Sequence, residues 1–182
     1  MDRSVGCNEN RSRLMNIEKV LLQAHSKAQC DKIVRYIGND KKRFAGLMQL
    51  FFTGEYKVRQ WAGWPMSYCV QKHPELILPY FKKMLAMMHK PGEHEAVNRS
   101  IVRLLQYVDI PKKFQGEIMN TCFEFVASND TAIAIKAFSL TILQNLSKDY
   151  PEILPELKLI IEERWPHETA AFKSRARKIL KI

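Results

Sequence analysis

One stretch of the chain and its diverged copy decide the fold: residues 58–81 read VRQWAGWPMSYCVQKHPELILPYF, and residues 135–157 read IKAFSLTILQNLSKDYPEILPEL. At an offset of 77 residues their apolar, basic and proline positions match: Val58 on Ile135, Arg59 on Lys136, Trp61 on Phe138 and Pro74 on Pro151. A looser copy starts at Val97 and a partial one at Phe172, so successive copies lie 39, 38 and 37 residues apart. This period is typical of helical solenoids, in which each unit buries its apolar face only against its neighbours.

Around these copies the chain reads as helix almost throughout. Apolar residues recur at spacings of three and four, glycine is scarce at 7 residues, and the alternation typical of strands is absent. Capping, glycine and proline signals divide the pattern, for example Ser26 with Gln29 three residues on, Gly38 and Pro111. About ten helices are predicted, near residues 12–24, 27–37, 40–53, 56–72, 75–89, 95–109, 112–127, 131–147, 152–164 and 169–181.

The helix predicted at 56–72 contains the segment WAGWPMSYC, residues 61–69. At about 100° per residue, one face of this helix is expected to be buried; it collects Val58, Trp61, Ala62, Pro65, Met66 and Cys69. The apolar period continues past Pro65, so we expect a bend there rather than the end of the helix. Trp64 and Tyr68 point elsewhere, and a shift of 39 residues places them on Arg103 and Tyr107. These four residues form either an exposed aromatic and basic strip, with a cation–π contact, or packing between repeats.

The repeat units resemble those of the HEAT repeat family. A HEAT unit has a first helix, a turn with an acidic residue, and a second helix that opens with Val-Arg followed by a small residue. The best match is Glu55, Val58, Arg59 and Ala62, and looser matches begin at Glu93, Asp130 and Glu168. The resemblance covers residues 40–182 and implies a single all-α domain, a right-handed α-α superhelix. Residues 12–38 are then an N-terminal capping pair and residues 1–11 a loose tail.

Three short segments, SYC (67–69), HPEL (73–76) and KSRARK (173–178), also resemble small HEAT-like proteins, some of which carry the label adenylosuccinate lyase. The signature loop of the lyase family resembles Ser-Ser-x-Met-Pro-x-Lys-x-Asn, and it is missing from this chain. The chain is also far too short for that enzyme. The sequence therefore predicts no lyase activity.

Composition excludes several other classes of protein. A chain of 182 residues, 46% hydrophobic and 26% charged, is typical of one globular core. It has no apolar run of the length that spans a membrane, and its first residues lack an apolar segment, so we expect no signal peptide. The 4 cysteines lack ligand spacing, so we expect free thiols in a cytoplasmic protein. His94 and His167 adjoin glutamates only in predicted turns, so we expect no metal and no cofactor. No phosphate loop, catalytic triad or inward carboxylate pair is found, and no catalytic residue is predicted.

The net charge of +10 is unevenly placed, because residues 11–53 carry +6 and residues 171–182 carry +5. In HEAT repeats the second helix of each unit lines the concave surface. Here the predicted second helices from residue 57 onward sum to +11, with Asp109 as their sole acid. The first helices at 111–128 and 151–166 carry 0 and −2. The resemblance thus implies an electropositive concave surface, which favours anionic partners.

The basic residues on these second helices fall into two groups. One group is expected to pair with turn acids in a structural ladder between repeats: Arg59, Lys136 and Lys173 with Glu55, Asp130 and Glu168. The other group is free to contact a partner together with the exposed aromatic residues: Arg99, Arg103, Arg175 and Arg177 with Trp64, Tyr68 and Tyr107.

A non-catalytic interaction scaffold is the preferred prediction, with an acidic protein segment bound on the basic concave surface. The alternative is binding of a nucleic-acid backbone by the same surface, which would be steeply salt-dependent. The HEAT-like alkylpurine DNA glycosylases provide an enzymatic precedent, but their chemistry needs a carboxylate, and the second helices provide only Asp109. Neither a membrane partner nor a small-molecule substrate is predicted.

Overall fold

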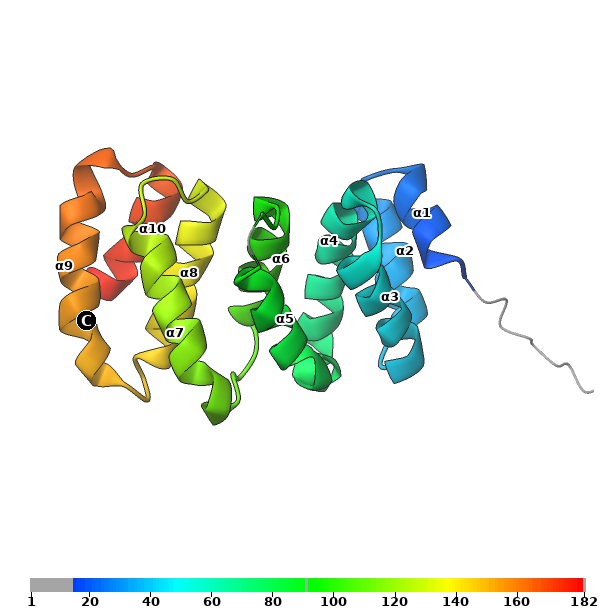
Figure 1. The fold of residues 1–182 in the computed structure, drawn as a ribbon, viewed down its shortest axis with the longest axis horizontal. Coiled ribbons are helices and arrows are strands. Elements are labelled where there is room, and N and C mark those ends of the chain that lie inside the picture. Colours follow the sequence, from blue (N-terminus) through cyan, green and yellow to red (C-terminus); the bar gives the residue numbers. More distant parts are fainter. Residues whose placement is uncertain (1–14, 91, 182) are drawn as a thin grey trace, which may run out of the picture.

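The computed structural model describes residues 15–90 and 92–181, so the predicted tail at residues 1–11 lies outside the described residues. Within this part the chain is all helical, with no strand, and the helices stand side by side from α1 at one end to α9 and α10 at the other (Figure 1). They are α1 (Ile17–Gln23), α2 (Lys27–Ile37), α3 (Lys41–Thr53), α4 (Tyr56–Lys72), α5 (Phe81–Met88), α6 (Glu95–Leu105), α7 (Lys112–Ala127), α8 (Ile133–Leu146), α9 (Leu154–Arg164) and α10 (Ala170–Leu180). None of these described helices is both long and apolar enough to span a membrane.

The helices pair in chain order, and the second members of the pairs form a continuous row. Helix α2 contacts α4, α4 contacts α6, α6 contacts α8, and α8 contacts α10. The first members α3, α5, α7 and α9 each contact the second helix of their own pair. We call α2, α4, α6, α8 and α10 the second-helix row. The solenoid predicted from the 37–39-residue period is therefore confirmed.

The buried face of α4 largely follows the prediction. Val58, Ala62, Met66 and Cys69 are all at most 1% exposed, and Pro65 is also buried within a helix that continues to Lys72. The prediction of a buried Trp61 is confirmed only in part, because this side chain packs against the hydrophobic core but is half-buried. Its ring lies against the turn between α1 and α2, which the periodicity of one helix does not reveal.

Capping side chains explain where α2 and α3 begin, and a glycine explains where α2 ends. Ser26 accepts a hydrogen bond from the Gln29 N–H at 3.3 Å, whereas the Gln29 side-chain oxygen has no partner among the described residues, so only half of the predicted capping box forms. Asp40 accepts from the backbone N–H groups of Lys42 and Arg43 at the start of α3. Helix α2 ends at Gly38, whose φ of 52° suits glycine.

Three predicted boundaries are wrong. The helix expected at 12–24 begins only at Ile17, because residues 15–16 are described but not helical. The helix expected at 75–89 begins instead as a 3₁₀ helix, η1 (Pro74–Tyr80), before α5. Pro79 lies inside η1 and has no N–H for an i→i−4 bond, so an α-helix cannot run through it undisturbed. The helix expected at 95–109 ends at Leu105.

Glycine at position 63 permits a close approach between α4 and α6. A Cβ atom there would lie 2.2 Å from the Ser100 hydroxyl oxygen and 2.6 Å from the Ser100 Cβ. Ser100 is itself buried, and its hydroxyl donates to the Ala96 carbonyl at 2.8 Å, so the side chain has little room to move aside. The close packing of α4 against α6 therefore requires a residue without a side chain at position 63.

Replacing Gly63 by alanine is expected to lower the free energy of unfolding by about 1–3 kcal/mol, the usual cost of overpacking. Gly46 in α3 and Gly116 in α7 are exposed and have nothing within 4 Å of an added Cβ. Alanine at either position is expected to raise the free energy of unfolding by about 0.5–1 kcal/mol through helix propensity. Urea unfolding of the three variants measures this, and a change in the same direction for all three would contradict the packing argument.

Candidate interaction groove

A groove crosses the second-helix row where α6 packs between α4 and α8. Its volume is about 400 Å³, and we call it the α4–α8 groove. It is lined by His25, Gln60, Gly63, Trp64, Arg99, Ser100, Arg103, Ala134 and Phe138. The lining combines aromatic rings, small residues and two guanidinium groups, and it includes no carboxylate among the described residues.

Each of the three helices contributes a pair of lining residues four positions apart. These pairs are Gln60 with Trp64 on α4, Arg99 with Arg103 on α6, and Ala134 with Phe138 on α8. Residues four apart lie on the same face of a helix, so each helix presents one face to the groove. Because α4 contacts α6 and α6 contacts α8, these three faces lie side by side.

Two arginines at the groove, Arg103 and Arg175, lie over aromatic rings rather than beside carboxylates. The Arg103 guanidinium carbon lies 5.8 Å from the centroid of the Tyr68 ring, and that of Arg175 lies 5.4 Å from the Phe138 ring. Within the described residues, neither they nor Arg99 make an ion pair. A cation–π contact orients a guanidinium while leaving its charge and its hydrogen-bond donors for a ligand.

An aromatic cluster closes the α2 end of the groove. The His25 ring stacks on Trp61 with centroids 5.1 Å apart and meets Trp64 edge-on at 5.2 Å. Trp64 is half-buried, and its indole nitrogen is buried without a hydrogen-bond partner among the described residues. The cation–π contact considered between Trp64 and Arg103 is replaced by the contact of Arg103 with Tyr68. The same Tyr68 ring also receives Lys27, at 4.6 Å.

Arg59 and Glu93 form an ion pair between neighbouring repeats. The Arg59 Nη2 lies 2.7 Å from the Glu93 Oε2, and its Nε donates to the Phe51 carbonyl at 3.2 Å. The hydrogen bond from Arg59 lowers the pKa of Glu93, against the opposing effect of burial. This cation is therefore neutralised within the protein.

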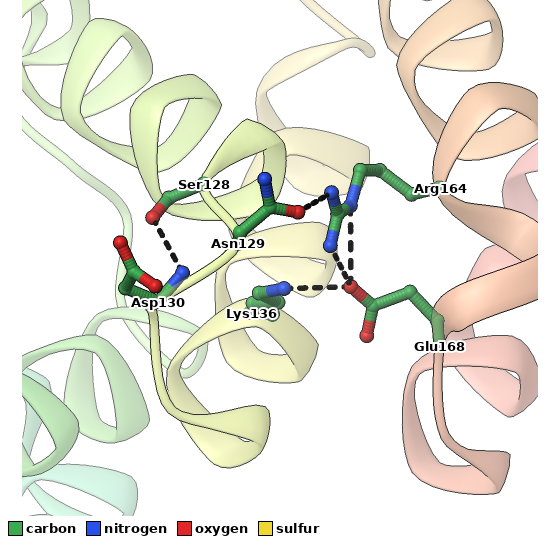
Figure 2. A network of polar contacts seen from close by, with 6 residues as sticks. All are labelled: Ser128, Asn129, Asp130, Lys136, Arg164 and Glu168. Atoms are coloured by element: carbon green, nitrogen blue, oxygen red, sulfur yellow. Dashed lines mark hydrogen bonds and ion pairs between the residues drawn. The ribbon is translucent and has the colours of Figure 1, made fainter.

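Lys136 and Glu168 form the equivalent pair two repeats later. The Lys136 ammonium donates to the Glu168 carboxylate at 2.6 Å, and Arg164 donates to the same oxygen through Nη2 at 3.2 Å. Figure 2 shows Asn129 reaching the other side of Arg164 from the turn between α7 and α8. Burial raises the pKa of Glu168, but the hydrogen bonds from Lys136 and Arg164 outweigh it, so the pKa lies below its ordinary value.

The ion pairs are shifted by one repeat from the simplest reading of the sequence. Arg59 contacts the acid in the next turn along the chain, Glu93, rather than Glu55. Glu55 and Asp130 make no ion pair within the described residues. The residue that corresponds to Arg59 and Lys136 in the intervening repeat is Asn98, so this repeat has no cation to pair with Asp130. The side-chain oxygen of Asn98 is buried without a hydrogen-bond partner among the described residues.

Three candidate residues lie away from the α4–α8 groove. Arg177 and Lys173 both sit 5.7 Å from the Trp165 ring, next to the end of α9. Lys173 makes no ion pair with any described residue. Tyr107 is 49% exposed and lines a separate groove with Asp109. The structure therefore gathers Trp64, Arg99 and Arg103 and separates Tyr107 and Arg177 from them.

Six groove residues were not predicted from the sequence: His25, Gln60, Gly63, Ser100, Ala134 and Phe138. Ala134 and Phe138 could have been found from the sequence, because they are four residues apart, as are Arg99 and Arg103 on the neighbouring helix. His25 carries none, since it precedes the start of α2 and reaches the groove only through the way α1 and α2 pack.

The described cysteines are poor nucleophiles. Cys30, Cys69 and Cys122 are buried free thiols. Burial raises the pKa of Cys30 to about 11 and the pKa of Cys69 and Cys122 to about 12, so the reactive thiolate is scarce at neutral pH. No group of three His, Cys, Asp or Glu side chains with a metal-binding arrangement occurs in the described part of the chain.

Comparison with protein families matches residues 17–182 to the family described as HEAT repeat domain. Comparison with curated proteins gives no match, and comparison with solved structures gives none either. The match covers the ten α-helices of the described residues and agrees with the paired helices and their second-helix row. The chain is thus a member of the HEAT repeat domain family.

Proposed function

We propose that this protein is a non-catalytic scaffold that binds an acidic protein segment in the α4–α8 groove. HEAT repeats commonly serve as protein-interaction scaffolds. The observation that carries the proposal is a contrast between cations of the second-helix row. Arg59 and Lys136 are neutralised by Glu93 and Glu168, whereas Arg99 and Arg103 line a groove without a carboxylate.

The composition of the groove favours a protein segment over a nucleic-acid backbone. A backbone-binding surface neutralises roughly 6–10 phosphates with a track of basic residues. The α4–α8 groove has two guanidinium groups, and much of its remaining lining is aromatic or small. Apolar side chains interspersed with carboxylates match this mixture better than a row of phosphates does.

The same lining supports a non-catalytic role. Glycosylase-type chemistry needs a carboxylate beside the aromatic residues of the cleft. Asp109 instead lies in the separate groove with Tyr107. The buried free thiols are compatible with a reducing compartment, and we propose that the protein acts in the cytoplasm.

A titration by fluorescence anisotropy tests the proposal. The probes are a labelled glutamate-rich peptide containing leucine and phenylalanine, the same peptide with lysine at every glutamate, and single- and double-stranded DNA. We expect the glutamate peptide alone to bind at physiological salt. Equal binding of the two peptides, or tighter binding of either DNA, would overturn the proposal.

A further inference from the structure

The order of side chains along the second-helix row specifies the partner more closely. Successive helices present Trp64 on α4, Arg103 on α6, Phe138 on α8 and Arg175 on α10. The four helices contact one another in that same order. A chain laid across them therefore meets an aromatic ring, a guanidinium, an aromatic ring and a guanidinium in turn.

The spacing of the helices converts this order into a sequence pattern. Packed helix axes lie about 8–10 Å apart, and an extended chain rises about 3.3 Å per residue. An extended segment therefore advances about three residues for each helix that it crosses. Apolar and acidic side chains that alternate at about every third residue would meet the rings and the guanidiniums in register.

The groove also has room for a side chain that this protein does not supply. Its volume of about 400 Å³ falls in the ~300–1,000 Å³ range of binding pockets. Gly63 and Ala134 contribute almost no bulk to its lining, and the Ser100 hydroxyl is already bonded to the Ala96 carbonyl. An aromatic side chain placed against Phe138 and over Ala134 would contact the Phe138 ring in the preferred offset or edge-on arrangements.

The guanidiniums are held where the acidic side chains would pass. Tyr68 supports Arg103 from one side, and Phe138 supports Arg175 at the α10 side of the groove. Arginine forks bind carboxylates through two parallel hydrogen bonds when the guanidinium plane is oriented in advance. The two arginines stand on either side of Phe138 along the row, so the segment needs acids on both sides of an apolar residue.

We propose that the bound segment is an extended peptide in which apolar and acidic residues alternate at about every third position. Its central aromatic residue fills the α4–α8 groove. This inference rests on the proposed function, since it names the acidic partner of the same groove. The proposed function requires only a negatively charged segment, whereas this inference also specifies the order of its residues and an aromatic residue that anchors it.

The test compares a peptide carrying this pattern with a scrambled peptide of identical composition, each titrated against the full chain. We expect the patterned peptide to bind at least about tenfold more tightly, as burial of one large apolar side chain implies. Ala134→Leu fills the groove without changing any charge, and it is expected to abolish that advantage. Phe138→Leu removes an aromatic ring from the groove lining and is a second variant, in case Ala134→Leu disturbs folding. Circular dichroism checks that both variants are folded.

The outcomes separate the two proposals. Equal affinity of the patterned and scrambled peptides for the wild type would overturn the pattern while leaving the acidic-segment function standing. An advantage that survives both groove variants would place the anchor elsewhere and also overturn the inference. Failure of both peptides to bind would instead count against the proposed function itself.

Discussion

Replacing Glu168 by alanine is expected to lower the free energy of unfolding by about 3–5 kcal/mol, because it leaves a buried charge without a partner. Lys136 is 3% exposed, and Glu168 is its ion-pair partner at 2.6 Å. Arg164 would lose the same acceptor. The penalty comes from the desolvated ammonium that remains, so it exceeds the small contribution typical of surface ion pairs.

The matched control is Glu163→Ala, which removes an exposed carboxylate from the neighbouring helix α9. It is expected to change the free energy of unfolding by less than about 0.5 kcal/mol. Chemical unfolding of both variants at neutral pH measures the difference. A loss below about 1 kcal/mol for Glu168→Ala would mean that water reaches Lys136 in solution.

Acid should weaken the wild-type protein through the same carboxylates. The folded pKa values of Glu93 and Glu168 lie below the ordinary value of 4.5. Their stabilising contribution is therefore complete well above pH 4.5 and is lost as the pH falls through the lower folded values. We expect the wild type to lose stability in that acidic window, and Glu168→Gln to show a flatter pH dependence there.

Replacing Arg99 and Arg103 together by alanine is expected to weaken binding of the glutamate-rich peptide by about 100-fold or more. Hydrogen bonds to charged groups contribute about 1.5–3 kcal/mol, and each factor of ten corresponds to about 1.4 kcal/mol. Both side chains line the α4–α8 groove, and neither makes an ion pair within the described residues. Their removal should therefore affect binding far more than folding.

A charge-matched control distinguishes a site from general attraction. Lys41→Ala with Lys42→Ala removes two exposed positive charges from α3, a first helix outside the second-helix row. Anisotropy titrations at two salt concentrations should show a small effect for this pair, and one that vanishes at high salt. Equal losses for the two double variants would show that net charge alone attracts the peptide.

The fold could be predicted from the sequence because it follows from periodicity. The spacing of Val58, Val97, Ile135 and Phe172 reports the repeat directly, and the apolar face of α4 follows from the helical period. The boundary at Pro74–Tyr80 was missed, since a proline inside a helical pattern permits either a bend or a 3₁₀ turn.

The contacts between repeats could not be predicted in the same way. Arg59 reaches Glu93 and Lys136 reaches Glu168 because the packed helices place each cation beside the following turn, and sequence spacing alone fits either neighbouring acid. Trp61 shows the same limit: its helical position suggests the core, but the turn holding His25 decides its surroundings. The distances between helices depend on how they pack together, and the residue pattern of a single helix does not determine that packing.

The central claim is that an acidic segment binds in the α4–α8 groove, and the indole N–H resonances of the 3 tryptophans test it most directly. Trp64 lines the groove, whereas Trp165 lies beside the basic side chains of Lys173 and Arg177. During titration with the glutamate-rich peptide, we expect the Trp64 resonance to shift most and the Trp165 resonance to stay in place. A larger shift at Trp165 than at Trp64, or no shift at Trp64 when the peptide is fully bound, would contradict the account.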